Sequence, residues 1–458
     1  MKKLYKNNGI WTLLSLMILI VLNYSCKKLI QIDAPVNEVL GSKVFNSEAS
    51  ADAAVNGLYT FFRNQFDGNG RLGFIPSFSS DELNDNSGNF IDFNTNRIIV
   101  DNGFNSGIWG NSYELIYQSN SIIEGAQLSN VLNLRKKNQL IGEAKFMRAF
   151  NYFELVNFYG DVPLITTTDV RITSIAARTS IDLVYQQIIA DLKDAQFLLD
   201  ESYPGADRSR VNRSAANALL ARVYLYKQEY GNAEIQATNV INITSVYQIE
   251  TLSNLFLKSS RETIFQIANI NGYTNLAQTF IANTDPINVP NCSFTDSFIA
   301  DLEAGDQRAS NWIRLKTVNN LPYFYPYKYR KLSSSVNLQP EYLIVLRLAE
   351  QYLIRAEARV MQGKLGDGRD DLNVIRRRAG LIDNSQDSKD DLLRAIEKER
   401  RVELCVEFGH RWFDLKRTKR ADQILSLVKP TWKPTAALYP IPLIELNNNP
   451  NLTPNPGY

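Results

Sequence analysis

The chain has 458 residues, of which 44% are hydrophobic, so it is long enough to bury a large core and is not predominantly disordered. Its 50 Lys and Arg residues against 48 Asp and Glu give a net charge of +2, too little for the basic face of a nucleic-acid-binding protein. A single histidine, His410, and three cysteines exclude zinc sites built from several histidines or four cysteines. We therefore expect no nucleic-acid partner. We predict no metal ligand and no cofactor, and the sequence leaves open whether carboxylate and backbone oxygens bind a metal ion.

The amino terminus has the pattern of a secretory signal. Basic residues are followed by thirteen mostly apolar residues, 10–22, and then by a small residue, Ser25, before Cys26. The apolar run is too short to span a bilayer as a helix, which needs about 20 residues. The stretch that ends in Ser25 and Cys26 resembles the lipobox of bacterial lipoproteins, so we expect removal of residues 1–25 and lipidation of Cys26. An ordinary signal with an incidental cysteine is the alternative.

Two further cysteines, Cys292 and Cys405, lie in the remainder of the chain. The sequence fixes neither their separation in space nor the geometry that a disulfide needs. We expect two isolated, buried thiols rather than a disulfide.

Four segments have the spacing of apolar side chains, three and four residues apart, that is typical of amphipathic helices. They cover residues 139–159, 180–199, 349–360 and 388–408. Gly160 is expected to end the first helix. A capping box formed by Thr179 and Asp182 is expected to begin the second helix. A capping box formed by Ser388 and Asp391 is expected to begin the fourth.

Two segments align with each other without a gap: ARVYLYKQEYGNAEIQATNVI from Ala221 and AEARVMQGKLGDGRDDLNVIR from Ala356. Each predicts a helix with small residues on one face, a tight turn near Gly231 or Gly366, and a second helix that begins at the next residue. This is the layout of a tetratricopeptide unit, in which small residues let paired helices approach closely. A simple antiparallel helix hairpin is the alternative. The expected fold is mainly α, with a tetratricopeptide-like scaffold of helix hairpins.

Between the helices lie two long stretches without helical periodicity, residues 64–110 and 271–345. They are far longer than ordinary connections, and their many aromatic residues favour a large loop-rich face with a few short strands. In the second stretch, tyrosines alternate from Tyr323 to Tyr329, which is typical of an extended strand. Pro326 indicates that this strand lies at the edge of a sheet.

The aromatic residues in these stretches suggest carbohydrate binding. Exposed rings stack on the apolar faces of sugars, while amide, carboxylate and guanidinium groups bind hydroxyls. The candidates for ligand contact are Arg71, Phe78, Asp81, Asn84, Phe90, Phe93, Trp312, Tyr323 and Tyr325. Trp312 and Tyr325 are the best stacking candidates. The alternative for each ring is that it packs the loops onto the helices, because large aromatic side chains are usually buried.

Two motifs that are typical of catalysis or cofactor binding are interpreted as structural. The sequence GNGRLG, residues 68–73, matches the dinucleotide-binding fingerprint, but a predicted helix precedes it and Pro76 prevents a long helix after it. We therefore interpret it as a glycine loop.

Glu399, Glu403 and Glu407 lie at four-residue spacing on one helix face. The carboxylates of a glycoside hydrolase flank a cleft from different elements, whereas these share a helix with arginines that keep them ionised. We expect an ion-pair network and no catalytic residue.

A set of separated blocks carries a family resemblance. They are WGNSYELIYQSNSIIE from Trp109, IGEAKFMRAFNYFELVNFYGDVPLI from Ile141, VNRSAANALLARVYL from Val211, RLAEQYLIRAEA from Arg347, LNVIRRRAGL from Leu372, EKERRVELCVEFGHRWFDLKR from Glu397 and YPIPLIELNNNPNLTPNPGY from Tyr439. In these blocks, which cover nearly all of the chain after the signal, the sequence resembles the RagB/SusD family of outer-membrane nutrient-uptake lipoproteins.

The resemblance implies a single SusD-like body over residues 26–458, with an N-terminal half at 26–235 and a C-terminal half at 236–458. It implies lipid anchoring at the outer membrane and partnership with a SusC-like TonB-dependent transporter, over which the lipoprotein acts as a lid that binds its ligand without hydrolysing it. Members exported to the cell surface often carry acidic residues after the lipidated cysteine, whereas Lys27 and Lys28 stand there in this chain. We expect the protein at the cell surface. Lys27 and Lys28 leave undecided which face of the outer membrane carries it.

The leading functional hypothesis is a lipoprotein that captures an oligosaccharide, or less readily a peptide, and delivers it to that transporter. Two alternatives stay open: a secreted glycoside hydrolase that uses the cluster from Glu399 to Glu407, and a helical-repeat scaffold that binds only protein. The placement of the carboxylates and the single histidine oppose the hydrolase. The sequence does not separate ligand capture from a scaffold.

Overall fold

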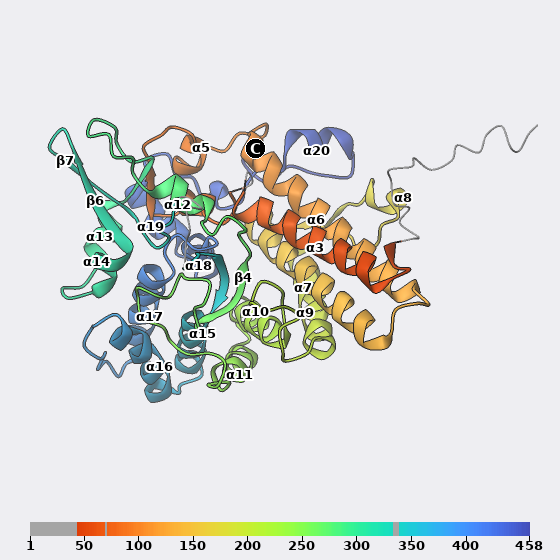
Figure 1. Ribbon diagram of the computed structural model, residues 1–458. Helices are drawn as coiled ribbons and strands as arrows, with labels where there is room; N and C mark the ends of the chain where they lie inside the picture. Colours follow the sequence, from red (N-terminus) through yellow and green to blue (C-terminus); the bar gives the residue numbers. More distant parts are fainter. Residues whose placement is uncertain (1–43, 69–70, 333–338) are drawn as a thin grey trace, which may run out of the picture. The chain divides into compact units, whose positions relative to one another are not determined.

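The computed structural model describes residues 44–68, 71–332 and 339–458, in which long helices are joined by stretches with short strands (Figure 1). The long helices are α3 (Glu48–Phe66), α6 (Gly103–Leu128), α7 (Leu134–Tyr159), α9 (Ile181–Leu198), α10 (Arg213–Tyr226), α11 (Tyr230–Ile241), α15 (Leu348–Met361), α16 (Leu365–Arg378) and α17 (Lys389–Glu403). The shorter helices are α4 (Ile75–Ser79), α5 (Ile91–Asn94), α8 (Val170–Thr173), α12 (Asn275–Phe280), α13 (Asp296–Asp301), α14 (Gln307–Trp312), α18 (His410–Arg417), α19 (Ala421–Val428) and α20 (Leu443–Asn448). Residues Phe45–Tyr458 form one compact unit.

The strands are short and pair two by two. They are β1 (Leu83–Asp85), β2 (Val162–Pro163), β3 (Arg178–Thr179), β4 (Thr263–Ile267), β5 (Cys292–Phe294), β6 (Ile313–Val318), β7 (Leu321–Pro326) and β8 (Leu343–Arg347). Within the described residues they form four antiparallel pairs: β1 with β5, β2 with β3, β4 with β8, and β6 with β7. The expected mainly α fold with a few short strands is confirmed.

The helix predicted over 139–159 is the C-terminal part of α7, which packs against α6 and α9 (Figure 1). Its apolar stripe, which includes Phe146, Phe150 and Phe153, is buried. The helix ends at Gly160, whose φ of +75° is a conformation that glycine adopts without strain. Local periodicity and a glycine stop were therefore sufficient to predict this central helix.

The start of α9 differs from the prediction. The residue at its N-cap is Ser180, and neither Ser180 nor Thr179 caps the helix with its side chain. Instead, the backbone N–H of Ile181 donates to Oδ1 of Asp161, 2.9 Å away, and Asp182 forms an ion pair with Lys227. The predicted capping box is wrong because side chains from other segments satisfy these groups.

The two similar segments form matching helix hairpins, α10–α11 and α15–α16. In each hairpin, the turn contains one residue with positive φ at the equivalent position, Gln228 at +59° and Gly363 at +82°. The second helices begin at Tyr230 and Leu365, two residues earlier than predicted. The gap-free alignment therefore corresponds to the same turn geometry in both hairpins.

Close packing in the second hairpin depends on a small residue. A Cβ added at Gly368 of α16 would lie 2.9 Å from the carbonyl oxygen of Ala356 and 2.5 Å from a methyl group of Val360, both in α15. The buried core beside it joins α15, α16 and α17 through the side chains of Ala349, Leu353, Ala356, Val360, Leu372, Ile375, Leu392 and Ile396. The stripe predicted over 349–360 is thus confirmed as core.

The predicted capping box of α17 is confirmed in part. Oγ of Ser388 accepts a hydrogen bond from the backbone N–H of Asp391 at 3.1 Å. The helix ends at Glu403, before the predicted Phe408, because Val406 and Phe408 have positive φ values of +58° and +43°. The chain therefore turns sharply after Glu403 and continues into α18.

Both cysteines in the described residues, Cys292 and Cys405, are buried and free, as expected. Burial raises the pKa of the Cys405 thiol to about 12, so this thiol is un-ionised at neutral pH.

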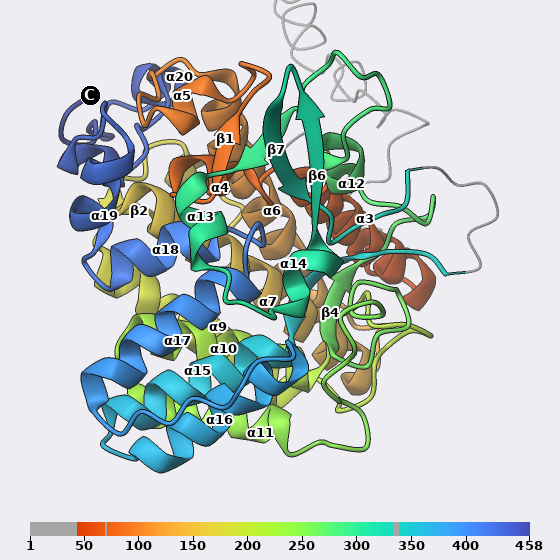
Figure 2. The same ribbon diagram turned by 90° about the vertical axis from the view of Figure 1, so that its left-hand side faces the viewer.

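The C-terminal segment holds the first long stretch onto the helices. Nζ of Lys429 donates to the carbonyl oxygen of Asn94 at 2.7 Å, and Nδ2 of Asn105 donates to that of Pro440 at 2.9 Å. In Figure 2, β1, α5 and the β6–β7 pair lie above the helix hairpins, so the helices support a separate, loop-rich layer.

Candidate functional site

The two long stretches are hydrogen-bonded to each other. Strand β1, from the first stretch, pairs with β5 from the second, and Asn84 lies opposite Ser293. We call the surface formed by the described parts of residues 64–110 and 271–345 the loop-rich face. The pairing brings the two sets of candidate residues onto one layer of the structure.

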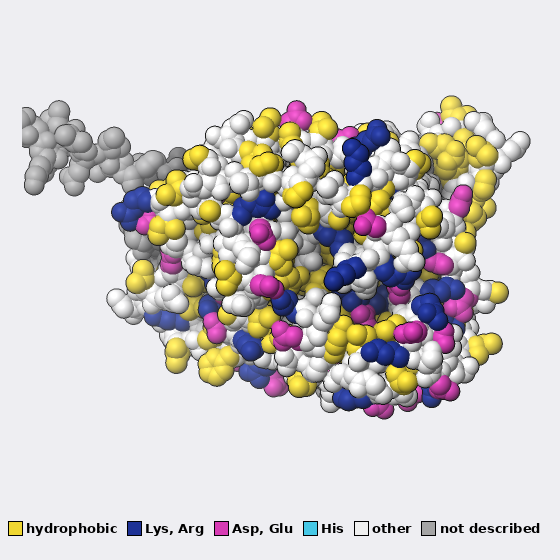
Figure 3. Space-filling model, turned by 180° about the vertical axis from the view of Figure 1, so that it is seen from behind, with side chains coloured by type: hydrophobic (Ala, Val, Ile, Leu, Met, Phe, Trp, Pro, Cys, Tyr) yellow, Lys and Arg dark blue, Asp and Glu magenta, His cyan; other side chains and the backbone are white. Residues whose placement is uncertain are grey.

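The most prominent element of this face is the β6–β7 hairpin, which projects from the layer (Figures 1 and 2). Its turn consists of Asn319 and Asn320, whose φ values of +51° and +63° fit a two-residue hairpin turn. The pair has no further strand among the described residues, so Pro326 lies at an edge, as predicted. Hydrophobic side chains gather on the projection at the upper right of Figure 3.

The strand register places tyrosines and cations on one face of the hairpin. Tyr323 lies opposite Lys316, and Tyr325 lies opposite Arg314. Directly opposite residues of an antiparallel pair share a face. Phe324 points to the other face, because neighbouring residues of a strand alternate. Both tyrosines are half-buried, so part of each ring is accessible.

Four of the predicted contact rings lie in the core. Phe78, Phe90, Phe93 and Trp312 are at most 3% exposed. Phe78 stacks on Phe90 with ring centroids 4.9 Å apart. The indole N–H of Trp312 donates to the carbonyl of Leu252 at 3.2 Å, and Nζ of Lys328 lies 4.7 Å from the ring centroid. We correct the interpretation of these four rings, because a ring covered on both sides offers no face to a sugar.

Asp81 is also structural. Its carboxylate accepts two hydrogen bonds from the Arg411 guanidinium, at 2.7 and 3.0 Å, and Nη2 of Arg401 lies 2.9 Å away. Burial opposes ionisation of Asp81, but the hydrogen bonds and charges of these arginines outweigh it and lower the pKa. The carboxylate is therefore occupied by two guanidiniums and is not available to a ligand hydroxyl.

Four predicted residues stay accessible: Arg71, Asn84, Tyr323 and Tyr325. The guanidinium of Arg71 lies 5.7 Å from the centroid of the buried Phe90 ring. Partial burial raises the pKa of the Tyr325 hydroxyl, so it is protonated and able to donate a hydrogen bond at neutral pH.

A cleft that the sequence interpretation missed borders the loop-rich face. Trp109, Tyr113 and Tyr117 of α6, with Glu445 and Asn448 of α20, line a cavity of about 360 Å³. Tyr117 is 51% exposed. Burial raises the pKa of Glu445. The four-residue spacing of the three aromatic residues was the available sequence signal, but α20 comes more than 300 residues later. We call this the α6–α20 cleft.

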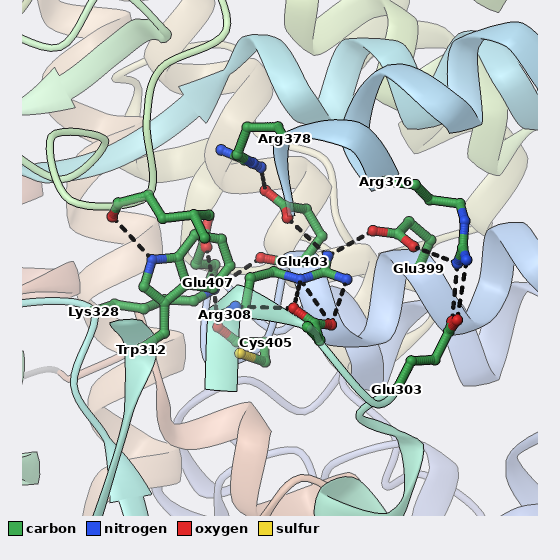
Figure 4. Close-up of polar contacts among 12 residues, drawn as sticks. Glu303, Arg308, Trp312, Lys328, Arg376, Arg378, Glu399, Glu403, Cys405 and Glu407 are labelled. Carbon is green, nitrogen blue, oxygen red and sulfur yellow. Dashed lines mark hydrogen bonds and ion pairs between the residues drawn. The ribbon is translucent and has the colours of Figure 1, made fainter. Parts of the chain in front are cut away.

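The three glutamates of α17 and the turn after it form a buried ion-pair network (Figure 4). Glu403 accepts hydrogen bonds from Arg347 at 2.6 Å, from Arg308 at 3.0 Å and from Arg378. Burial opposes the ionisation of Glu403, but the charges of these arginines outweigh it and hold the pKa well below its usual value. Glu403 is therefore ionised and fully enclosed.

The other two glutamates are engaged in the same way. Arg308 donates to Glu399 at 2.6 Å, and Lys328 donates to Glu407 at 2.5 Å. Burial raises the pKa of Glu399, as a general acid would need, but Glu399 is 2% exposed and cannot reach a glycosidic bond. The geometry supports the structural interpretation over the hydrolase.

Neither a metal centre nor a membrane-spanning helix occurs among the described residues. No group of three or more His, Cys, Asp or Glu side chains is placed to bind a metal ion there, and no helix is long and apolar enough to cross a bilayer. Cys26 lies outside the described residues, so the lipidation prediction is not tested by the structure.

Comparison with known proteins gives consistent matches. The family description "Starch-binding associating with outer membrane" matches residues 35–225, and "SusD family" matches residues 303–458. The SusD-like protein P2 of Formosa agariphila is 27% identical to the chain, over 93% of it and 95% of that protein.

Solved structures show the same fold. A SusD-like protein from Bacteroides fragilis is similar with a TM-score of 0.77 and 22% identity, over 93% of this chain and 100% of its own. A laminarin-binding SusD-like protein is similar with a TM-score of 0.76 and 22% identity, over 90% of this chain and 100% of its own. The matches to family, relative and fold agree with the helix hairpins and the loop-rich face, and the chain belongs to the SusD/RagB family.

Proposed function

We propose that this protein binds an oligosaccharide on its loop-rich face and delivers it to a SusC-like TonB-dependent transporter without hydrolysing it. The observation that carries the proposal is the β6–β7 hairpin, which presents Tyr323 and Tyr325 on one face together with Arg314 and Lys316. Proteins of this family bind carbohydrate and work with SusC-type transporters. The laminarin-binding SusD-like protein gives an example of such a ligand on the same fold.

The chemistry of this hairpin face suits a sugar. A pyranose has an apolar C–H face, which stacks on an aromatic ring, and a rim of hydroxyls, which accept hydrogen bonds from groups such as the Tyr325 hydroxyl. Lys316 is not such a donor, because its Nζ donates to the carbonyls of Asn283 and Asp285, at 2.9 and 2.7 Å, and to Oδ1 of Asn283. Alternate residues of a strand lie about 6.8 Å apart, so the rings of Tyr323 and Tyr325 are placed to contact neighbouring sugar units. Arg71 and Asn84 are the other accessible polar groups of the predicted set.

Removing both rings should weaken glycan binding. We expect the Tyr323→Ala/Tyr325→Ala variant to lose about two- to tenfold in affinity per ring, because a stacking contact contributes about 0.5–1.5 kcal/mol beyond area burial. The melting temperature should change little, since both rings are partly exposed. Isothermal titration of the mature protein against a glycan panel that includes laminarin and starch oligosaccharides measures the effect.

Two matched variants locate the site. Phe324→Ala removes a ring from the opposite face of the same strand, and Tyr117→Ala removes an exposed ring from the α6–α20 cleft. Both should retain wild-type affinity. If Tyr117→Ala abolishes binding while the double tyrosine variant retains it, the ligand site lies in the cleft. If no glycan on the panel binds, the scaffold that binds only protein is favoured.

Anchoring to the outer membrane through a lipidated Cys26 is the second part of the proposal. Its support is the signal pattern together with the outer-membrane association of the family. Each buried methylene of an acyl chain contributes about 0.8 kcal/mol, so several chains on one cysteine anchor a protein stably.

Cys26→Ala should therefore move the protein from the membrane to the soluble fraction, and mass spectrometry of the native terminus should find acyl chains on Cys26. An unmodified terminus at another residue would contradict the anchor.

A SusC-like transporter should co-purify with the wild-type protein from solubilised membranes. Protease added to intact cells should cleave the protein at the cell surface. Failure of co-purification would argue against delivery to such a transporter, while leaving sugar binding intact.

A further inference from the structure

A cavity of about 610 Å³ lies among the helices, and none of its lining residues belongs to the loop-rich face. Its wall is formed by the C-terminal parts of α10 and α15, by α17 and α18, and by the segment that joins α18 to α19. In Figure 2, α10, α15 and α17 lie below β1, α5 and the β6–β7 pair. We call it the α17–α18 cavity. Its volume falls within the range of small-molecule sites, which is about 300–1,000 Å³.

Cations outnumber carboxylates in its lining. Five cationic side chains, Arg394, Arg400, Arg417, Lys419 and Arg420, line the cavity with three carboxylates, Glu357, Glu397 and Asp414. The lining therefore has an excess of two positive charges. This excess favours an anionic ligand, because a concave site with a net charge attracts ions of the opposite sign.

The three carboxylates are already neutralised by the protein. Glu357 accepts two hydrogen bonds from Arg417, at 2.6 and 2.8 Å. Asp414 accepts from Arg400 at 2.8 Å and from Arg417 at 2.6 Å. Glu397 is paired with two further arginines. The carboxylates thus have little capacity left for a cationic ligand. Among the lining cations, Arg394 also has a carboxylate partner, Asp391, in an exposed ion pair at 2.5 Å.

Two deeply buried side chains of the wall have an unsatisfied polar atom. Tyr226 is 9% exposed and Arg400 is 2% exposed. Oη of Tyr226 and Nη1 of Arg400 have no hydrogen-bond partner among the described residues. A buried polar group without a partner is costly, and a charged one especially so. An oxygen-rich ligand that enters the cavity would supply an acceptor close to these groups.

The rim adds two further features that favour an anion. Lys419 is exposed and has no carboxylate within 4.0 Å in the part of the chain that the structure describes. The helix α19 begins at this rim, and its N-cap residue, Arg420, makes no capping hydrogen bond with its side chain. The first N–H groups of a helix, together with its dipole, attract negative charge.

We propose that the α17–α18 cavity binds a small molecule through a carboxylate or sulfate group. Lys419 and the net positive charge of the lining attract the oxyanion, and Tyr226 and Arg400 provide donor atoms that have no partner among the described residues. This inference does not depend on sugar binding at the loop-rich face, because the two surfaces share no residue.

Matched neutral and acidic probes test the site in the mature protein. D-glucuronate and D-glucose differ by one carboxylate, and sulfate provides a second oxyanion without a sugar. We expect saturable binding of glucuronate or sulfate by calorimetry, with no binding of glucose in this cavity. Binding of glucuronate but not of sulfate identifies a carboxylate site. Binding of sulfate but not of glucuronate identifies a sulfate site. Sulfate also stabilises most proteins without binding at one site. That effect rises linearly with sulfate concentration, whereas binding to the cavity saturates.

Variants of the rim and wall assign the binding to this cavity. Arg394→Gln/Lys419→Gln removes two exposed cations and should weaken binding about tenfold or more. Tyr226→Phe removes only the unsatisfied hydroxyl, so it should fold normally and weaken binding roughly two- to tenfold. Lys193→Gln, an exposed lysine on α9 outside the cavity, is the matched control and should bind as wild type.

The Tyr323→Ala/Tyr325→Ala variant should also bind the acidic probe as wild type, which separates this proposal from the function of the loop-rich face. The absence of saturable binding of both oxyanions would overturn the proposal. So would equal binding of glucose and glucuronate, or binding that all of the rim and wall variants leave unchanged.

Discussion

Replacing Glu403 by Gln should lower the free energy of unfolding by about 3–5 kcal/mol, because removing one member of a buried ion-pair network leaves its partners charged and unpaired. The partners are the guanidiniums of Arg308, Arg347 and Arg378, all of which donate to this carboxylate. Glutamine retains the shape of the side chain, so packing loss contributes little. Urea unfolding at pH 7 measures the change.

The same substitution should make the free energy of unfolding depend less on pH in the acidic range. The three guanidiniums depress the pKa of Glu403 in the folded state, so the unfolded chain takes up its proton first as the pH falls. The stability from Glu403 is present above the unfolded pKa of about 4.5 and is lost as the pH falls towards the folded value. The wild type should lose this stability on acidification, and Glu403→Gln should not.

Asp383→Asn is the control for this prediction, because Asp383 and Arg377 form an exposed pair. This substitution should change the free energy of unfolding little, because solvent and salt screen an exposed ion pair. Glycan affinity of the folded Glu403→Gln protein should stay near the wild-type value. Unchanged stability together with loss of hydrolytic activity would instead support the glycoside hydrolase.

Glu154→Gln should raise the free energy of unfolding above that of the wild type at pH 8. This gain should be about 3 kcal/mol larger at pH 8 than at pH 5. Glu154 is 1% exposed in α7, and its Oε1 has no hydrogen-bond partner among the described residues. Burial raises its pKa to about 8, and the charge of Arg222 offsets only part of this effect. The folded state therefore retains a proton that the unfolded chain releases above about pH 4.5.

The sign follows from this difference in bound protons. Between about pH 4.5 and 8, stability falls by up to about 1.4 kcal/mol per pH unit, because the unfolded chain binds fewer protons than the folded one. Glutamine does not titrate, so it removes this loss at high pH and changes little at pH 5. Thermal unfolding at both pH values measures the difference.

Glu143→Gln is a matched control on the same helix. Glu143 accepts hydrogen bonds from Arg210 at 2.6 and 2.8 Å, so its loss should destabilise the protein at both pH values. If Glu154→Gln also destabilises the protein equally at both pH values, Glu154 is ionised in the folded state and the prediction is wrong.

The helical scaffold was predictable because its signals are local. The spacing of apolar residues identified α7, and a gap-free alignment identified two hairpins whose turns share a positive φ at Gln228 and Gly363. The capping box of α17 was also correct at Ser388. That of α9 was wrong, since Asp161 satisfies the first N–H group from outside the helix.

The candidate site was less predictable because burial depends on contacts between distant segments. From the sequence, Trp312 and Tyr325 are equally good candidates for stacking on a sugar. In the structure, Trp312 is enclosed by Leu252 and Lys328, while Tyr325 lies on a projecting hairpin. Asp81 pairs with Arg411, which is 330 residues away along the chain. Composition identifies a pool of aromatic and acidic residues, and only the pairing of remote segments decides which of them a ligand reaches.

The attachment of the β6–β7 hairpin has an evolutionary consequence. Trp312 ends the helix just before β6, and Lys328, two residues after β7, lies against its ring and donates to the carbonyls of Glu403 and Cys405, both at 2.8 Å. Both ends of the hairpin are thus fixed at one place in the body, while its turn, Asn319 and Asn320, projects from it. If the ligand binds at this hairpin, as proposed, substitutions or length changes between these two residues would alter ligand preference while the helices stay the same.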